Sequence, residues 1–198
     1  MGLDLEYSSG QTPLDEDEKD GLLIETISTH GDLNEFEQLT IEEAMKWTYG
    51  KTFKAETVFT EEFIRMIHRR MFGNVWVWAG KFRKTNKNLG VDKLLISVEL
   101  KVLCDNALFW LHNRIYREDE IAILFKHKIV SMHCFPNGNG RHSRLMGDLI
   151  IVNVFGKKPF SWGAKELLLS GDSRSNYLQA LKAADRGDYA PLLTFARS

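Results

Sequence analysis

The chain has 198 residues, of which 43% are hydrophobic, and a formal net charge of −1. This length suits one well-packed domain, and the balanced charge excludes bulk attraction to nucleic acid or to an anionic membrane. Its two cysteines, Cys104 and Cys134, are too few for a disulfide scaffold or a four-thiolate zinc site. Neither a signal peptide nor an apolar run of membrane-spanning length is visible, so we expect a soluble, cytoplasmic protein.

Residues 1–20 are acidic, contain Gly and Pro, and lack hydrophobic periodicity. This composition is typical of an arm, either disordered or draped over the domain. We therefore expect an N-terminal extension at residues 1–38, with an inhibitory role argued below, and a single domain at residues 39–198.

Hydrophobic residues recur with the helical period from Leu22 onward. Thr40 and Glu43 fit a capping box that opens a helix ending at Gly50. Thr60 is the expected cap of the next helix, which Gly73 ends. The further predicted helices are residues 97–113, 119–133, 144–156, a helix at 173–187 capped by Asp172, and a short last helix with Pro191 and Leu192.

Residues 80–96 (GKFRKTNKNLGVDKLLI) look unlike a helix. Their centre is basic and contains Asn and Gly, which favours a short hairpin. The predicted fold class is therefore all-α with one short β-hairpin flap.

Residues 133–144 (HCFPNGNGRHSR) carry more polar chemistry than a turn requires. They join a strongly amphipathic predicted helix to the most apolar one. The start of the second helix presents unpaired backbone N–H groups and a positive dipole end, which together form an anion site. Gly138 and Gly140 let this backbone approach a ligand without obstruction by a Cβ.

Two arginines and one histidine complete this set. Arg141 and Arg144 lie three residues apart and share a helix face. Two guanidinium groups beside backbone amides suit a polyphosphate better than a single carboxylate. His133 ends the preceding helix and is a candidate general base, because histidine titrates near neutral pH.

Other interpretations of these residues are weaker. An isolated NGNG is usually a turn, and paired arginines on a helix are usually solvated. The residues His127, His133, Cys134 and His142 lack the ligand spacing of known zinc sites. The run is neither a Walker loop, since no Gly-Lys-Ser/Thr follows, nor a dinucleotide fingerprint, since Ser143 stands where the third glycine belongs.

The run resembles the signature of the Fic family, which reads His-x-Phe-x-(Asp/Glu/Asn)-Gly-Asn-Gly-Arg-x-x-Arg. The matching positions are His133, Phe135, Asn137, Gly138, Asn139, Gly140, Arg141 and Arg144. WAGKFRKTNKNLGVD resembles the hairpin flap of the family, and DSRSNYLQALKAADRGDYAPLLTF resembles its closing helices. The resemblance covers most of residues 40–198 and is nearest to the subgroup called mobile mystery protein B, found in bacteria beside a helix-turn-helix partner.

This resemblance implies a Fic-type helical bundle that transfers AMP from ATP to a Tyr, Thr or Ser hydroxyl of a target protein, as a toxin or regulator. His133 would accept the proton of the attacking hydroxyl, Phe135 would anchor the loop, and Asn137 would help to hold Mg²⁺. The implied nucleotide-binding residues are Asn137, Gly138, Asn139, Gly140, Arg141, Arg144, Leu89, Gly90, Val91, Tyr177 and Asp185. For Tyr177, core packing is the alternative.

The resemblance also implies partners. A target protein would dock on the flap by strand addition, and a helix-turn-helix antitoxin or regulator would accompany the chain. We expect neither membrane binding nor direct contact with nucleic acid.

The sequence departs from the family pattern at Asn137 and at Cys134, which replaces a common Pro and alters only the stiffness of the loop. Asn137 replaces an acidic residue of many active members and is a weaker metal ligand. Gly140 is retained where the related Doc-type kinases carry Lys, which argues against phosphoryl transfer. A Doc-like protein kinase and a nucleotide-sensing module without turnover remain the alternatives.

Many Fic proteins carry a brake with the pattern Ser/Thr-x-x-x-Glu-(Gly/Asn), in which the glutamate pairs with the second signature arginine. In STHGDLNEFE, residues Ser28, Asp32 and Asn34 approximate this pattern, although Leu33 replaces the usual Gly. Asp32, or else Glu35, is therefore the expected inhibitory carboxylate. A solvated acidic helix start is the alternative.

Overall fold

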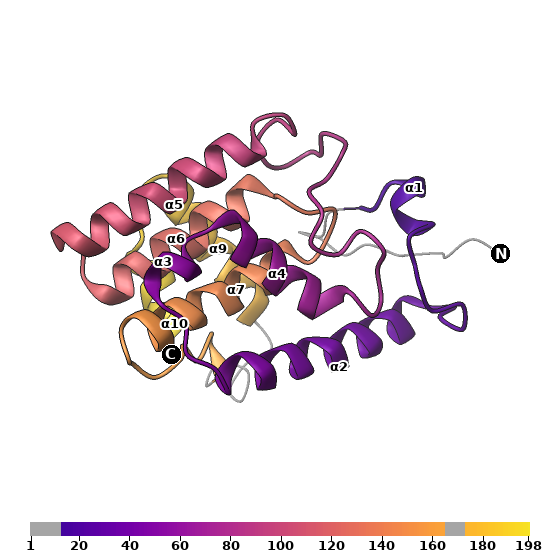
Figure 1. The fold of residues 1–198 in the computed structure, drawn as a ribbon, viewed down its shortest axis with the longest axis horizontal. Coiled ribbons are helices and arrows are strands. Elements are labelled where there is room, and N and C mark those ends of the chain that lie inside the picture. The colour runs from indigo at the N-terminus through magenta and orange to yellow at the C-terminus, as the bar shows by residue number, and fades with distance from the viewer. Residues whose placement is uncertain (1–12, 165–172) are drawn as a thin grey trace.

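The computed structural model describes residues 13–164 and 173–198 (Figure 1). Its elements in chain order are α1 (Glu16–Lys19), α2 (His30–Tyr49), α3 (Ala55–Val58), α4 (Glu61–Phe72), α5 (Ile96–Asn113), α6 (Glu118–Met132), α7 (Asn139–Leu149), the π-helical η1 (Ile150–Val154), α9 (Ser173–Asp185) and α10 (Ala190–Arg197). The expected cap Asp172 lies outside the described residues.

Helices α6 and α7 form the centre of the bundle. Helix α6 packs against both α5 and α7, and α2 packs against α4 on the other side of α7 (Figure 1). The side chains that α6 and α7 turn inward are almost fully buried, among them Ile123, Phe125, Met146 and Leu149. Burying one such side chain contributes roughly 1.5–3 kcal/mol, so this pair provides a firm base for the segment that connects it.

Helix α2 begins at Thr29 and not, as predicted, at Thr40. Thr29 Oγ1 accepts the N–H of Asp32 at 3.1 Å, and the Asp32 carboxylate accepts the N–H of Thr29 at 3.0 Å. Thr40 lies inside the helix, and its hydroxyl donates to the carbonyl oxygens of Glu37 and Met71. The capping box at Thr29 therefore opens a helix that runs through the expected domain boundary at residue 38.

The other predicted helices are close to those in the structure. Thr60 caps α4 by accepting the N–H of Phe63 at 3.1 Å, as predicted. Helix α7 begins at Asn139, five residues before the predicted start, because Gly138 adopts a left-handed φ of 77° and turns the chain into the helix.

The predicted hairpin at residues 80–96 does not form. Residues 80–95, hereafter the flap loop, contain only turns and bends in the structure. The N–H groups of Arg83 and Val91 donate to the carbonyl oxygens of Cys134 and Met132, at 3.0 and 3.2 Å. These donors therefore bind the segment after α6 and are not available for a ladder across the loop.

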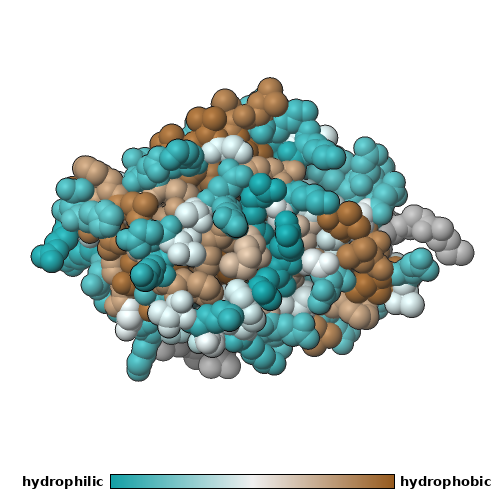
Figure 2. All heavy atoms as spheres, in the orientation of Figure 1, coloured by the Kyte–Doolittle hydropathy of each residue, from teal (hydrophilic) through white to brown (hydrophobic). Residues whose placement is uncertain are grey.

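Two surface features complete the fold. Apolar side chains gather along the α5 edge of the molecule, where Val98, Val102 and Phe109 are exposed (Figure 2). None of the helices described for this chain is long and apolar enough to cross a membrane.

Candidate nucleotide site

Residues 133–138, between α6 and α7, form a loop that buried side chains hold in place. Phe135 is fully buried, and its ring stacks on that of His68 with centroids 3.8 Å apart. The Asn139 side chain accepts the N–H of Phe135 at 3.0 Å and donates to its carbonyl oxygen at 2.8 Å. Phe135 therefore anchors the loop as the resemblance implies, whereas the Asn139 side chain faces the core and leaves only its backbone to face a ligand.

His133 is half-buried and ends α6 in a left-handed conformation, with φ of 53°. Its Nδ1 lies 3.1 Å from the carbonyl oxygen of Val130, which can only accept, so Nδ1 carries the proton and Nε2 is the nitrogen that can accept one. Burial lowers the pKa of His133 below its ordinary value, and the Arg83 and Lys87 charges lower it further, although the bond to Val130 raises it. The imidazole is therefore neutral near pH 7, as a general base must be.

His68 on α4 is a site residue that the sequence did not reveal. Its Nδ1 accepts the N–H of Gly80 at 3.0 Å, so its Nε2 donates to the carbonyl oxygen of Asn137 at 3.0 Å. Burial holds the pKa of His68 well below its ordinary value. This neutral histidine therefore joins the flap loop to the peptide that precedes Gly138.

The first turn of α7 brings the expected anion donors together. Because the first N–H groups of a helix lack intrahelical acceptors, the backbone at Asn139, Gly140 and Arg141 presents donors at the positive end of the α7 dipole. A Cβ at Gly138 would lie 2.5 Å from the Phe72 ring, so a glycine is required there. An anion at this end of α7 would also meet the side chain of Arg141.

The two signature arginines have different neighbours. Arg141 Nη2 lies 2.6 Å from Oε2 of Glu37 on α2, while Arg144 stacks on Tyr177 of α9, with its guanidinium 5.6 Å from the ring centroid. Glu37 is buried, and its other carboxylate oxygen accepts the indole N–H of Trp76 at 2.6 Å. A partner for a signature arginine thus comes from α2, although from neither Asp32 nor Glu35.

A cavity of about 220 Å³ lies between α2 and α7. Both signature arginines line it, together with Gln38, Ile41, Met45, Met71, Leu145, Asp148 and Trp162. Its volume is below the roughly 300–1,000 Å³ of typical ligand sites, so it suits part of a nucleotide rather than the whole.

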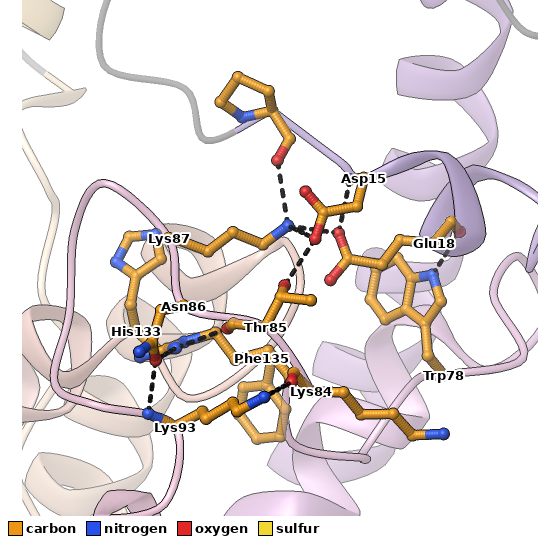
Figure 3. Close-up of polar contacts among 12 residues, drawn as sticks. Asp15, Glu18, Trp78, Lys84, Thr85, Asn86, Lys87, Lys93, His133 and Phe135 are labelled. Atoms are coloured by element: carbon orange, nitrogen blue, oxygen red, sulfur yellow. Dashed lines mark hydrogen bonds and ion pairs between the residues drawn. The ribbon is translucent and has the colours of Figure 1, made fainter.

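The flap loop lies against His133. Gly90 has φ of 101°, and a Cβ on it would lie 2.7 Å from the His133 Cβ. Leu89 is half-exposed and Val91 is partly buried, so these three predicted nucleotide contacts stand beside the candidate base. Figure 3 shows Lys87 extending from this loop, past His133, to two carboxylates of the N-terminal segment.

That N-terminal segment holds the outer side of the flap loop. Lys87 Nζ lies 2.8 Å from Asp15 Oδ2 and 2.6 Å from Glu18 Oε2 (Figure 3). The Thr85 hydroxyl donates to Asp15, and the Trp78 indole N–H donates to the Glu18 carbonyl oxygen at 2.9 Å. The part of the extension that the structure describes is therefore draped over the domain.

The remaining predicted site residues lie elsewhere. The Asp32 carboxylate is exposed and serves the cap of α2, and its bonds to Thr29 and Ser28 lower its pKa. Glu35 is exposed on the same helix. The Asp185 carboxylate, at the end of α9, accepts the Nε2–H of buried His127 at 2.9 Å. The structure thus joins Tyr177 to the signature through Arg144, whereas Asp185 contacts α6.

The donor set for a metal ion is small. In the part of the chain that the structure describes, no group of three or more His, Cys, Asp and Glu side chains could hold a metal. Asn137 offers one neutral oxygen, which now accepts the N–H of Gly138. One oxygen ligand from the protein is compatible with a Mg²⁺ ion whose other ligands are phosphate oxygens and water. It is not enough for a metal ion that only protein side chains coordinate.

Most of the chain is similar to curated proteins. Protein adenylyltransferase Fic of Aedes aegypti is 26% identical over 163 residues, which cover 80% of this chain and 31% of that protein. The protein of the same name from Nematostella vectensis is 26% identical over 163 residues, covering 80% of this chain and 36% of its own length. The chain spans about a third of the length of these curated relatives.

Solved structures share the fold. Fic-1 from C. elegans superposes with a TM-score of 0.67 at 24% identity, covering 90% of this chain and 51% of that chain. BepC from Bartonella tribocorum, with bound AMPPNP, has a TM-score of 0.63 at 17% identity, covering 91% of this chain and 95% of its own. The family model that matches residues 58–151 is described as Fic/DOC family. This stretch runs from the end of α3 through the signature to η1, so the similarity to the Fic/DOC family includes the loop between α6 and α7.

Proposed function

We propose that this chain transfers AMP from ATP to a Tyr, Thr or Ser hydroxyl of a target protein. The observation that carries the proposal is the pairing of a neutral, single-tautomer His133 with the amide-rich start of α7 and its two arginines. The relatives named protein adenylyltransferase Fic support the same activity. The bound AMPPNP of BepC supports a nucleotide as the ligand of this fold.

The proposed step is a displacement at the α-phosphate. The target hydroxyl oxygen forms a bond to the α-phosphorus, its proton passes to Nε2 of His133, and the bond from the α-phosphorus to the bridging oxygen breaks to release pyrophosphate. The backbone at Gly138, Asn139 and Gly140 donates to phosphate oxygens, while Arg141 and Arg144 bind the outer phosphates. Leu89, Gly90 and Val91 cover the nucleotide, and Tyr177 and Asp185 contact its nucleoside.

Magnesium fits this proposal as an ion that arrives with ATP. Asn137 would turn its side-chain oxygen from Gly138 to the ion, which neutralises phosphate charge when bound. Because the ligand is neutral, we expect weaker Mg²⁺ binding than a carboxylate would give at this position.

The flap loop is the proposed docking site for the target protein, a segment of which would pair with the loop backbone by strand addition. The resemblance to mobile mystery protein B supports a bacterial, cytoplasmic protein acting as a toxin or regulator, with a helix-turn-helix antitoxin as its partner.

Residues 13–38 would restrain the activity. Among the acidic residues of α2, Glu37 has the geometry for this role, because its pair with Arg141 competes with the phosphates of ATP. Asp32 and Glu35 remain the candidates from the sequence pattern, and the variants described in the Discussion separate the three.

Label transfer tests the proposed function. Protein incubated with Mg²⁺ and α-labelled ATP is expected to label itself or a protein of a bacterial lysate, and γ-labelled ATP is expected to leave no label. Transfer from the γ position would instead indicate a Doc-like kinase. Calorimetric ATP binding without any pyrophosphate release, even after Glu37→Gln, would indicate a nucleotide-sensing module.

A further inference from the structure

Arg83 occupies a central place in the flap loop. The residue is only 3% exposed, although a guanidinium group is strongly polar. Its Nε donates to the carbonyl oxygen of His133 at 2.6 Å, and its Nη1 donates to the carbonyl oxygen of Thr85 at 2.8 Å. The remaining three bonds go to the Asn86 side chain and to the carbonyl oxygens of Val91 and Met132. All five interactions have oxygen acceptors, so the buried charge is well compensated.

These acceptors belong to two segments that must stay together. The oxygens of Met132 and His133 are among the last carbonyls of α6, which have no partner inside the helix. Those of Thr85 and Val91 lie at the two ends of the part of the flap loop that faces His133. Arg83 therefore caps the helix that carries the candidate base and closes the flap loop upon it.

The backbone at His133 needs such support. Its φ of 53° lies in the left-handed region, which is unfavourable for any residue with a Cβ. The same peptide orientation lets its imidazole donate to the carbonyl oxygen of Val130. Residues in this conformation persist when their surroundings hold them there, and the 2.6 Å bond from Arg83 is one such restraint.

We propose that Arg83 is a positioning residue for AMP transfer: it fixes the main chain of His133, and thereby the tautomer and direction of the imidazole that accepts the hydroxyl proton. This inference rests on the proposed function and adds a residue outside the signature. Because Arg83 is buried, it would act through His133 and the flap loop.

The shape of the side chain decides which substitutions can replace it. A guanidinium fork directs five N–H groups to acceptors spread in one plane, whereas a lysine ammonium offers three donors from one point. Arg83→Lys keeps the charge beside His133 but cannot reach both the α6 carbonyls and the flap loop. Arg83→Met removes the charge as well.

Arg65 supplies a matched control. Its Nε also donates to a main-chain oxygen, that of Gly80, at 2.9 Å, and it pairs with Glu61 at 3.1 Å. It makes these bonds one turn into α4, at the start of the flap loop and away from His133. Arg65→Met thus removes a comparable arginine without touching the candidate base.

The experiment compares Arg83→Lys, Arg83→Met and Arg65→Met with the unaltered chain by two readouts. The first is the pair of imidazole nitrogen chemical shifts of His133, which report its tautomer and need no activity. The second is kcat for AMP transfer, with ATP affinity measured by calorimetry. Both Arg83 variants should give a mixture of His133 tautomers and lower kcat by roughly 10- to 100-fold, the range expected when a reacting group is misplaced. ATP affinity should change less than kcat, since the proposed phosphate donors lie on α7, and Arg65→Met should match the unaltered chain.

Unchanged His133 shifts and kcat in both Arg83 variants would overturn the inference. So would a loss of kcat that only follows the ATP-binding stoichiometry, because that result indicates fewer folded molecules. If Arg83→Met does not fold, the His133 shifts and kcat of Arg83→Lys alone test the inference. If the unaltered chain transfers no AMP, the proposed function fails, whereas the His133 shifts still decide whether Arg83 positions the imidazole.

Discussion

The flap loop and helix α2 both contact the signature with a buried charge, but at opposite ends and to different effect. Arg83 of the flap loop donates to main-chain oxygens that no ligand would use. Glu37 of α2 pairs with Arg141, a side chain that phosphate would use. We therefore expect the buried charge of Arg83, whose partners are mainly backbone, to support the site, and that of Glu37, whose partner is Arg141, to restrain it.

Replacing the candidate base His133 should have the largest effect on the rate of AMP transfer. His133→Ala should lower AMP transfer by about 10²- to 10⁴-fold, the usual contribution of general-base catalysis. ATP binding should persist, because the phosphate donors lie on α7. Rates from α-labelled ATP and calorimetry with the same preparation check both statements. Transfer by His133→Ala at the unaltered rate would assign the proton to another group.

Replacing Arg141 and Arg144 in turn tests whether the ion pair with Glu37 of α2 limits ATP binding. Charge-assisted bonds are worth about 1.5–3 kcal/mol, so Arg144→Ala should weaken ATP binding by roughly 10- to 100-fold. Arg141→Ala should cost less, because part of its charge is already committed to Glu37. Calorimetric ATP titrations of the two variants provide the ranking. A larger loss from Arg141→Ala would mean that the pair with Glu37 opens freely.

Weakening the ion pair between Glu37 and Arg141 should raise the rate of AMP transfer. Glu37→Gln keeps an acceptor for the Trp76 indole but removes the negative charge that holds Arg141. We expect AMP transfer to rise several-fold, with Glu42→Gln, an exposed position on the same helix, as the control.

Asp32→Ala and Glu35→Ala complete the series. If either of them raises transfer and Glu37→Gln does not, the brake lies at the start of α2, as the sequence pattern indicated. Asp32→Ala should in any case lower stability, because its carboxylate belongs to the helix cap. Thermal unfolding measures that loss separately from the rate.

The acid limb of the pH dependence of AMP transfer tests the influence of the flap loop on His133. Burial first, and then the charges of Arg83 and Lys87, lower the pKa of His133. Because a general base must be unprotonated, transfer should be lost only as the pH falls through this lowered pKa, below the ordinary histidine value of about 6.5. Arg83→Met should move this limb towards higher pH. The profile of kcat/KM between about pH 5 and 8 shows whether it does.

The sequence was sufficient where one local rule governs the structure. Thr60 caps α4 because a side-chain oxygen there reaches the N–H of Phe63, and periodicity gave the limits of α6 to within a residue. The signature residues likewise carry their chemistry locally, so the loop and the two arginines could be recognised before any contact was known.

The parts that failed depend on contacts between distant segments. Glu37 lies on the buried face of α2, between Leu33 and Ile41. A charged residue at such a position interrupts the hydrophobic pattern, and only its contacts with Trp76 and Arg141 explain it. The late predicted start came from the Thr40–Glu43 pattern, whereas the capping box of the structure is formed by Thr29 and Asp32. A glutamate on an otherwise apolar face was the available signal.

The hairpin prediction failed for a similar reason. Residues 80–96 have the Asn and Gly content of a hairpin, but the N–H groups of Arg83 and Val91 donate to the carbonyl oxygens of Cys134 and Met132. His68 gave no signal at all, because a single histidine on an amphipathic helix has no pattern that links it to Asn137.

The most direct test of the account is the rate of label transfer from α-labelled ATP by Glu37→Gln, measured beside the same variant carrying His133→Ala. Glu37→Gln is expected to transfer AMP faster than the unaltered chain, and the added His133→Ala is expected to remove the transfer. Equal rates for Glu37→Gln and the unaltered chain would contradict the restraint by α2. Label transfer that survives His133→Ala would contradict the site itself.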